Sequence, residues 1–335
     1  MRILIVGGTS FVGRAVAWAA LNAGHDVTVI NRGQTPTDLP ATVTRLIGDR
    51  SQDLGALTPL NFDVTVDAIA YRPNDVARLR DAIGQRGGHH IQISSVSAYQ
   101  SPRSWTTETT ALLWDAVPDD PDAPITAENY GPFKAACERS AQALFGDRLT
   151  IVRPTYVIGA HDATMRFPYW VERLRRGGNV AVPGPRTNLL QYVDARNLGE
   201  FVVHLAELGQ FGEFHVANPF PAPRYLDVIE AIAQRVAPAQ TKLIEVSPEQ
   251  LMRHHLETRF PLWAGAHGDP NLAVDPEKAV TAGLRFRDLD DSVDDVTAWW
   301  NNRDWPTWWL TREQEAMLVR EAALPGGRPR PRLTP

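Results

Sequence analysis

Residues 1–13 read MRILIVGGTSFVG, and this stretch decides the fold. It opens with an apolar run at 2–6, which is typical of a strand buried on both faces. The glycines that follow allow a tight turn, and a helix-like run continues to about residue 23. A strand, a glycine turn and a helix in this order indicate a loop that receives a phosphate group at a helix N-terminus.

The alternation of short β-rich runs with helical runs continues to residue 155. We predict strands at 2–6, 26–31, 43–47, 64–68, 89–94 and 149–154, and later helices at 73–86 and 128–145. Strands that alternate with helices predict a parallel sheet. We therefore expect an α/β protein with a doubly wound, dinucleotide-binding (Rossmann) domain over residues 1–155.

The remainder of the chain has a different character. Residues 156–323 predict a smaller α/β lobe that binds substrate, because proline and glycine become frequent and strands become short. Within it, 191–216 is also compatible with a strand that returns to the main sheet. The last segment, 324–335, has no apolar pattern and predicts a flexible tail. The 100–127 loop suits either a lid over the site or a surface excursion.

Composition excludes several classes of function. The net charge of −5 over 335 residues gives no general attraction to nucleic acid or to an anionic membrane. The single cysteine, Cys137, excludes an intrachain disulfide and a thiolate metal cluster. The nine histidines show no metal-ligand spacing, so no metal is predicted. Residue 2 already starts a strand and no run reaches the ~18 apolar residues of a membrane span, so we expect a cytoplasmic protein.

The glycine turn and the end of the second predicted strand indicate a nicotinamide dinucleotide. Gly7, Ser10 and Gly13 occupy the three key positions of the turn, with a serine that can donate to a phosphate in the middle. Asn31 and Arg32 follow the second strand, where NAD-binding folds usually carry an acidic residue. Arg32 can pair with a 2′-phosphate, which favours NADP over NAD. Alternatively, Arg32 is one solvated arginine among many.

Residues 130–134 read YGPFK in a predicted helix, so Tyr130 and Lys134 share one helical face. A tyrosine of pKa ~10 becomes an effective acid–base group near neutral pH when a nearby ammonium stabilises its phenolate. Lys134 is one of only three lysines among the 34 basic residues, so a lysine here has a role that arginine does not fill. Ser95 is the candidate for orienting the substrate oxygen, with Ser97 as the substitute.

Several motifs together resemble the extended short-chain dehydrogenase/reductase family, also called the NAD-dependent epimerase/dehydratase family. They are GGTSFVG at 7–13, SSVSAY at 94–99, YGPFK at 130–134 and VRPTYVIG at 152–159. QYVDARNLGEFVV at 191–203 and the segment 275–300 are similar to the C-terminal lobe of that family. The resemblance covers about residues 1–301.

The resemblance implies roles for individual residues. Tyr130 would be the acid–base group, Lys134 its partner and the ribose anchor, and Ser95 the substrate-orienting hydroxyl. The cofactor-binding set would add to Asn31 and Arg32 the residues Gly7, Ser10, Phe11, Val12 and Gly13 at the pyrophosphate, Asp49 and Arg50 at the adenine, Ala68, Ala70 and Tyr71 along the cofactor, and Pro154 and Val157 beside the nicotinamide. Members of this family are commonly homodimers.

The sequence departs from the family pattern where substrate identity is decided. Sugar-nucleotide members commonly carry asparagine where this chain has Tyr156, and the R-P-x-x-V-x-G form is more similar to reductases. Ser97, Tyr156, Arg166 and Trp170 are the candidate substrate contacts. The phenylalanine after GGTS resembles an atypical branch that includes chloroplast RNA-binding proteins.

Three hypotheses follow from these observations. The first is an NAD(P)-dependent oxidoreductase that acts on a carbonyl or alcohol carbon of a small molecule, with no nucleic-acid partner. The second is a nucleotide-sugar epimerase or dehydratase with tightly bound NAD. The third is a non-catalytic cofactor-binding protein of the atypical branch.

Overall fold

The computed structural model describes residues 1–100, 105–109, 114–115, 120–218, 221–269, 273–300 and 303–323. The predicted tail at 324–335 lies outside these residues, as do 101–104, 110–113 and 116–119 of the 100–127 loop. The chain divides into two compact units. The first comprises Met1–Ile158, Gln191–Pro221 and Pro270–Arg287, and the second comprises Gly159–Leu190, Ala222–Asp269 and Asp288–Pro335.

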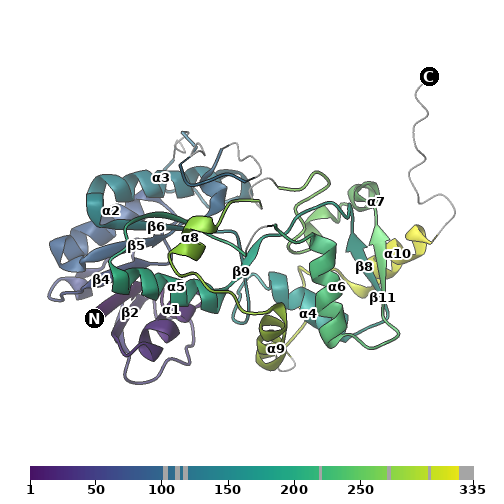
Figure 1. Ribbon diagram of the computed structural model, residues 1–335, viewed down its shortest axis with the longest axis horizontal. Coiled ribbons are helices and arrows are strands. Elements are labelled where there is room, and N and C mark those ends of the chain that lie inside the picture. The colour runs from purple at the N-terminus through teal and green to yellow at the C-terminus, as the bar shows by residue number, and fades with distance from the viewer. Residues whose placement is uncertain are drawn as a thin grey trace. The chain divides into compact units, whose positions relative to one another are not determined.

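Within the described residues, the first unit is built on a seven-stranded parallel sheet (Figure 1). Its strands are β1 (Arg2–Val6), β2 (Asp26–Asn31), β3 (Thr44–Ile47), β4 (Val64–Asp67), β5 (His89–Ile93), β6 (Leu149–Pro154) and β10 (Gly212–Val216). They lie in the order β10-β6-β5-β4-β1-β2-β3. This order confirms the predicted doubly wound α/β fold, and β10 is the strand that 191–216 returns to the sheet. Strand order reverses direction at β1 and β4, where open α/β sheets bind their ligands.

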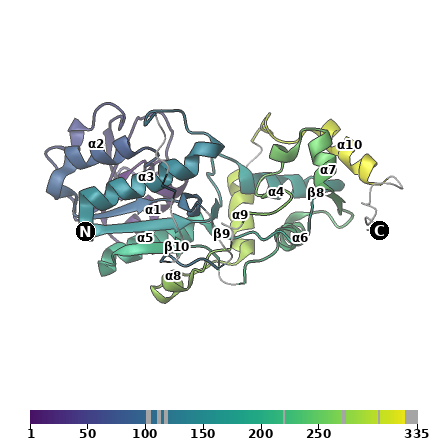
Figure 2. The same cartoon turned by 90° about the horizontal axis from the view of Figure 1, so that it is seen from above.

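Helices cover both faces of this sheet, which explains why β1 is apolar from Ile3 to Val6. Ile3 and Ile5 belong to a core cluster with residues of α1 (Phe11–Asn22) and α5 (Ala195–Leu208). Leu4 and Val6 belong to a second cluster with residues of α2 (Pro73–Ile83) and α3 (Ala127–Phe145). Figures 1 and 2 show α2 and α3 together on one face and α1 and α5 on the other. The alternation of side chains along a strand assigns each residue to one layer.

The helix predicted at 73–86 is shorter in the structure, because Gly84 has a φ of 53° and ends α2 at Ile83. Short 3₁₀ helices occupy 55–57, 84–87, 96–98, 146–148 and 257–259. β7 (Tyr156–Ile158) and β9 (Tyr192–Asp194) form a separate parallel pair. α8 (Glu277–Thr281) lies beside the edge strand β10, and Lys278 Nζ donates a hydrogen bond to the Glu213 carbonyl oxygen at 2.7 Å.

The second unit is held together by aromatic packing. Its elements are α4 (Arg166–Arg175), β8 (Asn179–Pro183), α6 (Tyr225–Val236), β11 (Lys242–Val246), α7 (Pro248–Arg253), α9 (Leu289–Trp300) and α10 (Arg312–Ala322), with β8 and β11 paired in parallel. Trp170 is fully buried, with its ring centroid 4.9 Å from that of Tyr169 and 5.9 Å from that of Tyr225. In the part of the chain that the structure describes, no helix is both long and apolar enough to cross a membrane.

Candidate cofactor and catalytic site

The glycine turn joins β1 to α1 with very close backbone packing. A Cβ atom at Gly13 would lie 2.2 Å from the carbonyl oxygen of Gly7, so no larger residue fits without a shift of the turn. Ser10 is the N-cap residue of α1, but its side chain makes no capping hydrogen bond. Its exposed hydroxyl is therefore available to a ligand at the helix N-terminus. Phe11, the first helical residue, has a φ of 37°, which is rare outside glycine.

A cavity of about 400 Å³ opens at the carboxyl ends of β1, β2 and β3, beside the glycine turn. The predicted cofactor residues that line it are Gly7, Ser10, Asn31, Arg32, Asp49, Arg50 and Tyr71. It is also lined by residues that the sequence analysis did not single out, including Thr9, Gln34, Thr35, Ser51, Arg72 and Asp75. The location and the tight glycine turn fit a dinucleotide, whose adenosine and phosphates would be held by these residues.

Other predicted cofactor residues lie outside the lining of this cavity. Phe11, Val12, Ala68 and Val157 pack in or against the core cluster that contains α1 and α5. Ala70 is fully buried in the opposite cluster, and Pro154 is the last residue of β6. A cofactor contact of these residues stays a prediction.

At one side of the cavity, Asn31 and Asp49 accept hydrogen bonds from the protein, whereas Arg32 is exposed. Asn31 Oδ1 accepts a hydrogen bond from the Gly33 N–H at 2.7 Å. Asp49 Oδ1 accepts from both the hydroxyl and the backbone N–H of Ser51, at 2.6 and 2.9 Å. These bonds, with a smaller effect of the Arg32 charge, hold the pKa of Asp49 below its usual value. Arg32 itself is exposed, and the structure records no acid partner for it among the described residues.

Arg50 forms the buried wall of the cavity. Its guanidinium donates two hydrogen bonds to the carboxylate of Asp67, at 2.6 and 2.8 Å, and its Nε lies 3.6 Å from Asp75 Oδ1. Only 9% of Arg50 and none of Asp67 is exposed. Burial opposes ionisation of both groups, but their mutual attraction raises the pKa of Arg50 and lowers that of Asp67. The pair is therefore charged.

The two carboxylates beside Arg50 also fix the chain between β4 and α2. Asp67 Oδ1 accepts a hydrogen bond from the Ile69 N–H at 3.1 Å. Asp75 Oδ2 accepts from the backbone N–H groups of Tyr71 and Arg72, at 3.3 and 3.0 Å. This segment carries the exposed ring of Tyr71 along the cavity.

Lys134 contacts the same segment from helix α3. Its Nζ donates hydrogen bonds to the carbonyl oxygens of Ala70 and Ile93, at 2.9 and 3.0 Å. It lies 4.9 Å from the ring centroid of Tyr71 and 5.8 Å from that of Tyr130. Burial favours a neutral lysine, but attraction to Tyr130 and Tyr71 outweighs it and raises the pKa of Lys134. The side chain therefore presents a fixed ammonium to both phenols.

Tyr130 lies in the first turn of α3, close to the loop that carries Ser95. Thr126 caps this helix, because its Oγ1 accepts from the Asn129 N–H at 3.4 Å. A Cβ atom at Gly131 would lie 2.3 Å from the carbonyl oxygen of Ser97, so the first turn of α3 packs directly on the serine loop. Ser95 Oγ accepts a hydrogen bond from the Ser97 N–H at 3.1 Å. The structure thus brings together the loop and the helix turn that hold the predicted catalytic groups.

A buried network of hydrogen-bonded polar side chains connects α3 to the sheet. Arg153 Nη2 donates to Glu138 Oε2 at 2.6 Å, and Arg153 Nη1 donates to the Tyr99 hydroxyl at 2.8 Å. The Tyr99 hydroxyl also bonds His215 Nε2 at 2.6 Å, and Ser94 donates to Glu138. Sequence analysis missed this network, although Glu138 stands one helical turn after Lys134 on the same face. The network joins α3, β6, β10 and the serine loop.

The predicted substrate residues have varied surroundings. Arg166 Nε donates to Thr164 Oγ1 at 2.8 Å, and Tyr156 is partly exposed in β7. Trp170 has no exposed surface, and its indole N–H donates to the Pro261 carbonyl oxygen at 2.8 Å. A side chain that is buried and already bonded has a packing role, which does not support the predicted substrate contact of Trp170. For Ser97, Tyr156 and Arg166 that contact stays a prediction.

The fold has counterparts among known proteins. Residues 3–217 match the NAD dependent epimerase/dehydratase family. UDP-N-acetylglucosamine 4-epimerase from Bacillus cereus has a similar structure, with a TM-score of 0.66, 16% identity and coverage of 92% of this chain and 99% of that one. UDP-glucuronic acid 4-epimerase from Bacillus cereus, solved in complex with NAD, gives a TM-score of 0.65, 17% identity and coverage of 89% and 98%. These identities establish similarity of fold.

A further relative is the chloroplast stem-loop binding protein of 41 kDa b from Arabidopsis thaliana, which is 24% identical over 213 residues. The match covers 59% of this chain and 53% of that protein. The chain therefore spans about half the length of this relative.

Proposed function

Because the chain belongs to the NAD dependent epimerase/dehydratase family, we propose that it is an NAD(P)-dependent oxidoreductase acting on a carbonyl or alcohol carbon of a small molecule. The observation that carries this proposal is the position of Lys134. Its ammonium is fixed by two carbonyl oxygens, next to Tyr130 and to a wall of the dinucleotide-sized cavity. A bound nicotinamide supplies the hydride donor or acceptor.

The chain's own residues handle the proton. In the direction of carbonyl reduction, the Tyr130 hydroxyl donates its proton to the substrate oxygen, and the Lys134 ammonium stabilises the phenolate that remains. Ser95 orients the same oxygen by a hydrogen bond. Ser10 and the N-terminus of α1 hold the pyrophosphate, and the buried Arg50 wall keeps the β4–α2 segment in place beside the cofactor.

Arg32 supports a preference for NADP. It is an exposed guanidinium at the rim of the cavity, at the end of β2, and no carboxylate occupies positions 31–33. A guanidinium suits a 2′-phosphate, because it can donate two parallel hydrogen bonds to the phosphate oxygens.

The test combines cofactor binding with turnover. Calorimetric titration with NADPH and NADH comes first, followed by a panel of aldehydes, ketones and acyl derivatives monitored at ~340 nm through nicotinamide absorbance. Tyr130→Phe should lower turnover of a verified substrate by about 100-fold or more while cofactor affinity stays unchanged. Tyr169→Phe is a matched control, because it removes a buried hydroxyl of the second unit that has no hydrogen-bond partner in the structure. Undiminished turnover by Tyr130→Phe would exclude the catalytic role.

A nucleotide-sugar epimerase is the second candidate, favoured by the names of the structurally similar proteins. An epimerase regenerates its cofactor in each turnover, so it would purify with bound NAD and produce no net absorbance change. Tyr156, at the position of the sugar-nucleotide asparagine, supports the reductase instead. A non-catalytic role, like that suggested by the name of the stem-loop binding relative, predicts cofactor binding without turnover of either substrate class.

A further inference from the structure

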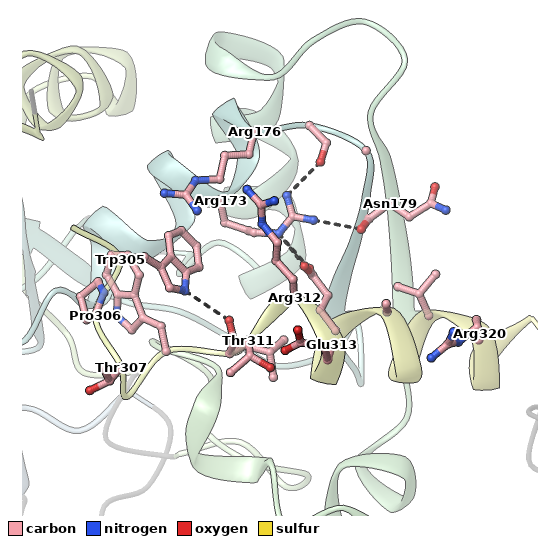
Figure 3. A pocket seen from close by; sticks show the side chains of 17 residues that line it. Arg173, Arg176, Asn179, Trp305, Pro306, Thr307, Thr311, Arg312, Glu313 and Arg320 are labelled. Atoms are coloured by element: carbon pink, nitrogen blue, oxygen red, sulfur yellow. Dashed lines mark hydrogen bonds and ion pairs between the residues drawn. The ribbon is translucent and has the colours of Figure 1, made fainter. Parts of the chain in front are cut away.

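A second cavity, of about 850 Å³, lies within the second unit (Figure 3). Its walls come from the end of α4, the start of β8, the segment 305–311 and one face of α10. All of its lining residues belong to the second unit, so it is separate from the dinucleotide cavity in the first. Neither the cofactor nor the proposed hydride transfer gives this cavity a role.

One wall of the cavity is formed by a buried ion pair between Arg173 and Glu315, which is neutral overall. Arg173 Nε donates to both carboxylate oxygens of Glu315, at 2.9 and 2.8 Å. The two terminal nitrogens of Arg173 donate to the carbonyl oxygens of Gly177 and Asn179, at 2.9 and 3.0 Å. Glu315 also accepts from the Ala181 N–H at 3.1 Å. This pair cancels its own charge and fixes α10 against β8, so the net charge of the cavity comes from other side chains.

The rim carries an excess of positive charge. The Arg176 guanidinium lies 4.0 Å from the ring centroid of Trp305, and its Nε donates a hydrogen bond to Glu172 Oε1 at 3.0 Å. Arg312 reaches up from the start of α10 toward Arg173 (Figure 3). The structure records no acid partner for Arg312 or Arg320 among the described residues, and Glu313 alone adds an uncommitted carboxylate to the lining. A local positive rim contrasts with the chain's net charge of −5.

One wall is aromatic and contains an unsatisfied donor. The ring centroids of Trp305 and Trp309 are 4.6 Å apart, with the rings nearly perpendicular. Trp305 Nε1 donates to the Leu310 carbonyl oxygen at 3.3 Å, but the buried Trp309 Nε1 has no acceptor in the structure. A buried N–H without a partner costs ~1–3 kcal/mol. An acceptor brought in by a ligand would remove that penalty.

We propose that this cavity binds a small organic anion, a phosphate or carboxylate attached to an apolar body. Arg312 holds the oxyanion, because its guanidinium supplies forked N–H donors that match phosphate and carboxylate oxygens. Arg176 assists through its terminal nitrogens, because only its Nε is bonded to Glu172. The apolar body lies against the indoles of Trp305 and Trp309. A wholly apolar ligand would leave the cationic rim without a partner, and an inorganic ion would leave the indoles without one.

Calorimetry on the full-length protein, at fixed sodium chloride concentration, tests both halves of this proposal. Phenyl phosphate and benzoate are the probes, with inorganic phosphate and benzyl alcohol as the oxyanion alone and the apolar body alone. We expect one of the two complete probes to bind at least about tenfold more tightly than either half. The stronger probe identifies whether phosphate or carboxylate is preferred. If neither phenyl phosphate nor benzoate binds more tightly than both inorganic phosphate and benzyl alcohol, the proposal is overturned.

Variants locate the site. Arg312→Ala should weaken the better probe at least about tenfold, while Arg235→Ala, a matched change at an exposed pair with Asp294 in the same unit, should leave it unchanged. Saturating NADPH should not displace the probe. Displacement by NADPH would instead place the anion in the first cavity and refute this inference, without affecting the proposed oxidoreductase activity.

Discussion

Arg50 and Arg32 line the same cavity of the first unit, yet they are held in opposite ways. Arg50 is 9% exposed, donates two hydrogen bonds to Asp67 and lies near Asp75. Arg32 is exposed at the rim; hydrogen bonds from Ser51 are the main cause of the lowered pKa of Asp49, and the Arg32 charge adds a smaller effect. A buried guanidinium whose donors are bonded to carboxylates has a structural role, whereas an exposed guanidinium is free to bind a ligand. The comparison therefore separates residues that stabilise the fold from residues that choose the cofactor.

The largest expected effect is on folding. Arg50→Met leaves the carboxylates of Asp67 and Asp75 buried without their cation, which should lower the free energy of unfolding by about 3–5 kcal/mol. Urea denaturation followed by circular dichroism measures this loss. Arg32→Met is the matched control and should change stability by no more than ~0.5 kcal/mol. Equal losses of unfolding free energy in both variants would show that Arg50 stabilises the fold no more than Arg32 does.

His90, which interacts electrostatically with Asp67, should make the free energy of unfolding depend on pH. His90 is fully buried and stacks on Phe145, with ring centroids 3.8 Å apart, and burial lowers its pKa from 6.5 to about 4. The unfolded chain therefore takes up a proton below pH 6.5 that the folded chain does not. Stability should fall as pH decreases from about 6.5 to 4, by up to about 3 kcal/mol from His90.

His90→Phe retains the stacked ring and removes the titration. Its free energy of unfolding, measured by urea denaturation at several pH values, should decline less steeply in this window than that of the wild type. Part of the decline should remain, because burial also lowers the pKa of His89 to about 4. Identical slopes for variant and wild type would show that His90 does not contribute.

The smallest expected effect is on cofactor choice. Arg32→Met should weaken NADPH binding about tenfold, or ~1.4 kcal/mol, and leave NADH affinity within about twofold. Calorimetric titration of both cofactors measures the ratio. If both affinities fall together, or neither changes, Arg32 does not contact a 2′-phosphate.

Much of the first unit could be predicted because its signals are local. The strands at 2–6, 26–31 and 149–154 have the predicted bounds, since each is a short run dominated by apolar and β-branched residues. The glycine turn and the YGPFK helix were also recognisable, because their chemistry depends on fixed spacing. The exact end of α2 was not, since Gly84 stops the helix before the polar pattern changes.

The buried charges could not be predicted for the opposite reason. Arg50 follows β3 and Asp67 ends β4, and these strands are separated in the sheet by β1 and β2. Their pairing therefore depends on strand order and on the reach of a long side chain, neither of which is visible in a local pattern. Trp170 shows the same limit in the second unit. Its burial depends on Tyr225 and Pro261, which are distant in the sequence.

The close packing of Gly131 on the Ser97 carbonyl oxygen holds the first turn of α3 directly against the serine loop. Because glycine has no side chain, the turn that bears Tyr130 packs directly on the loop that bears Ser95. A larger residue there would push the turn that bears Tyr130 away from the loop that bears Ser95. Position 131 therefore sets the separation between these two side chains, and with it the size of the substrate that the proposed reductase would accept.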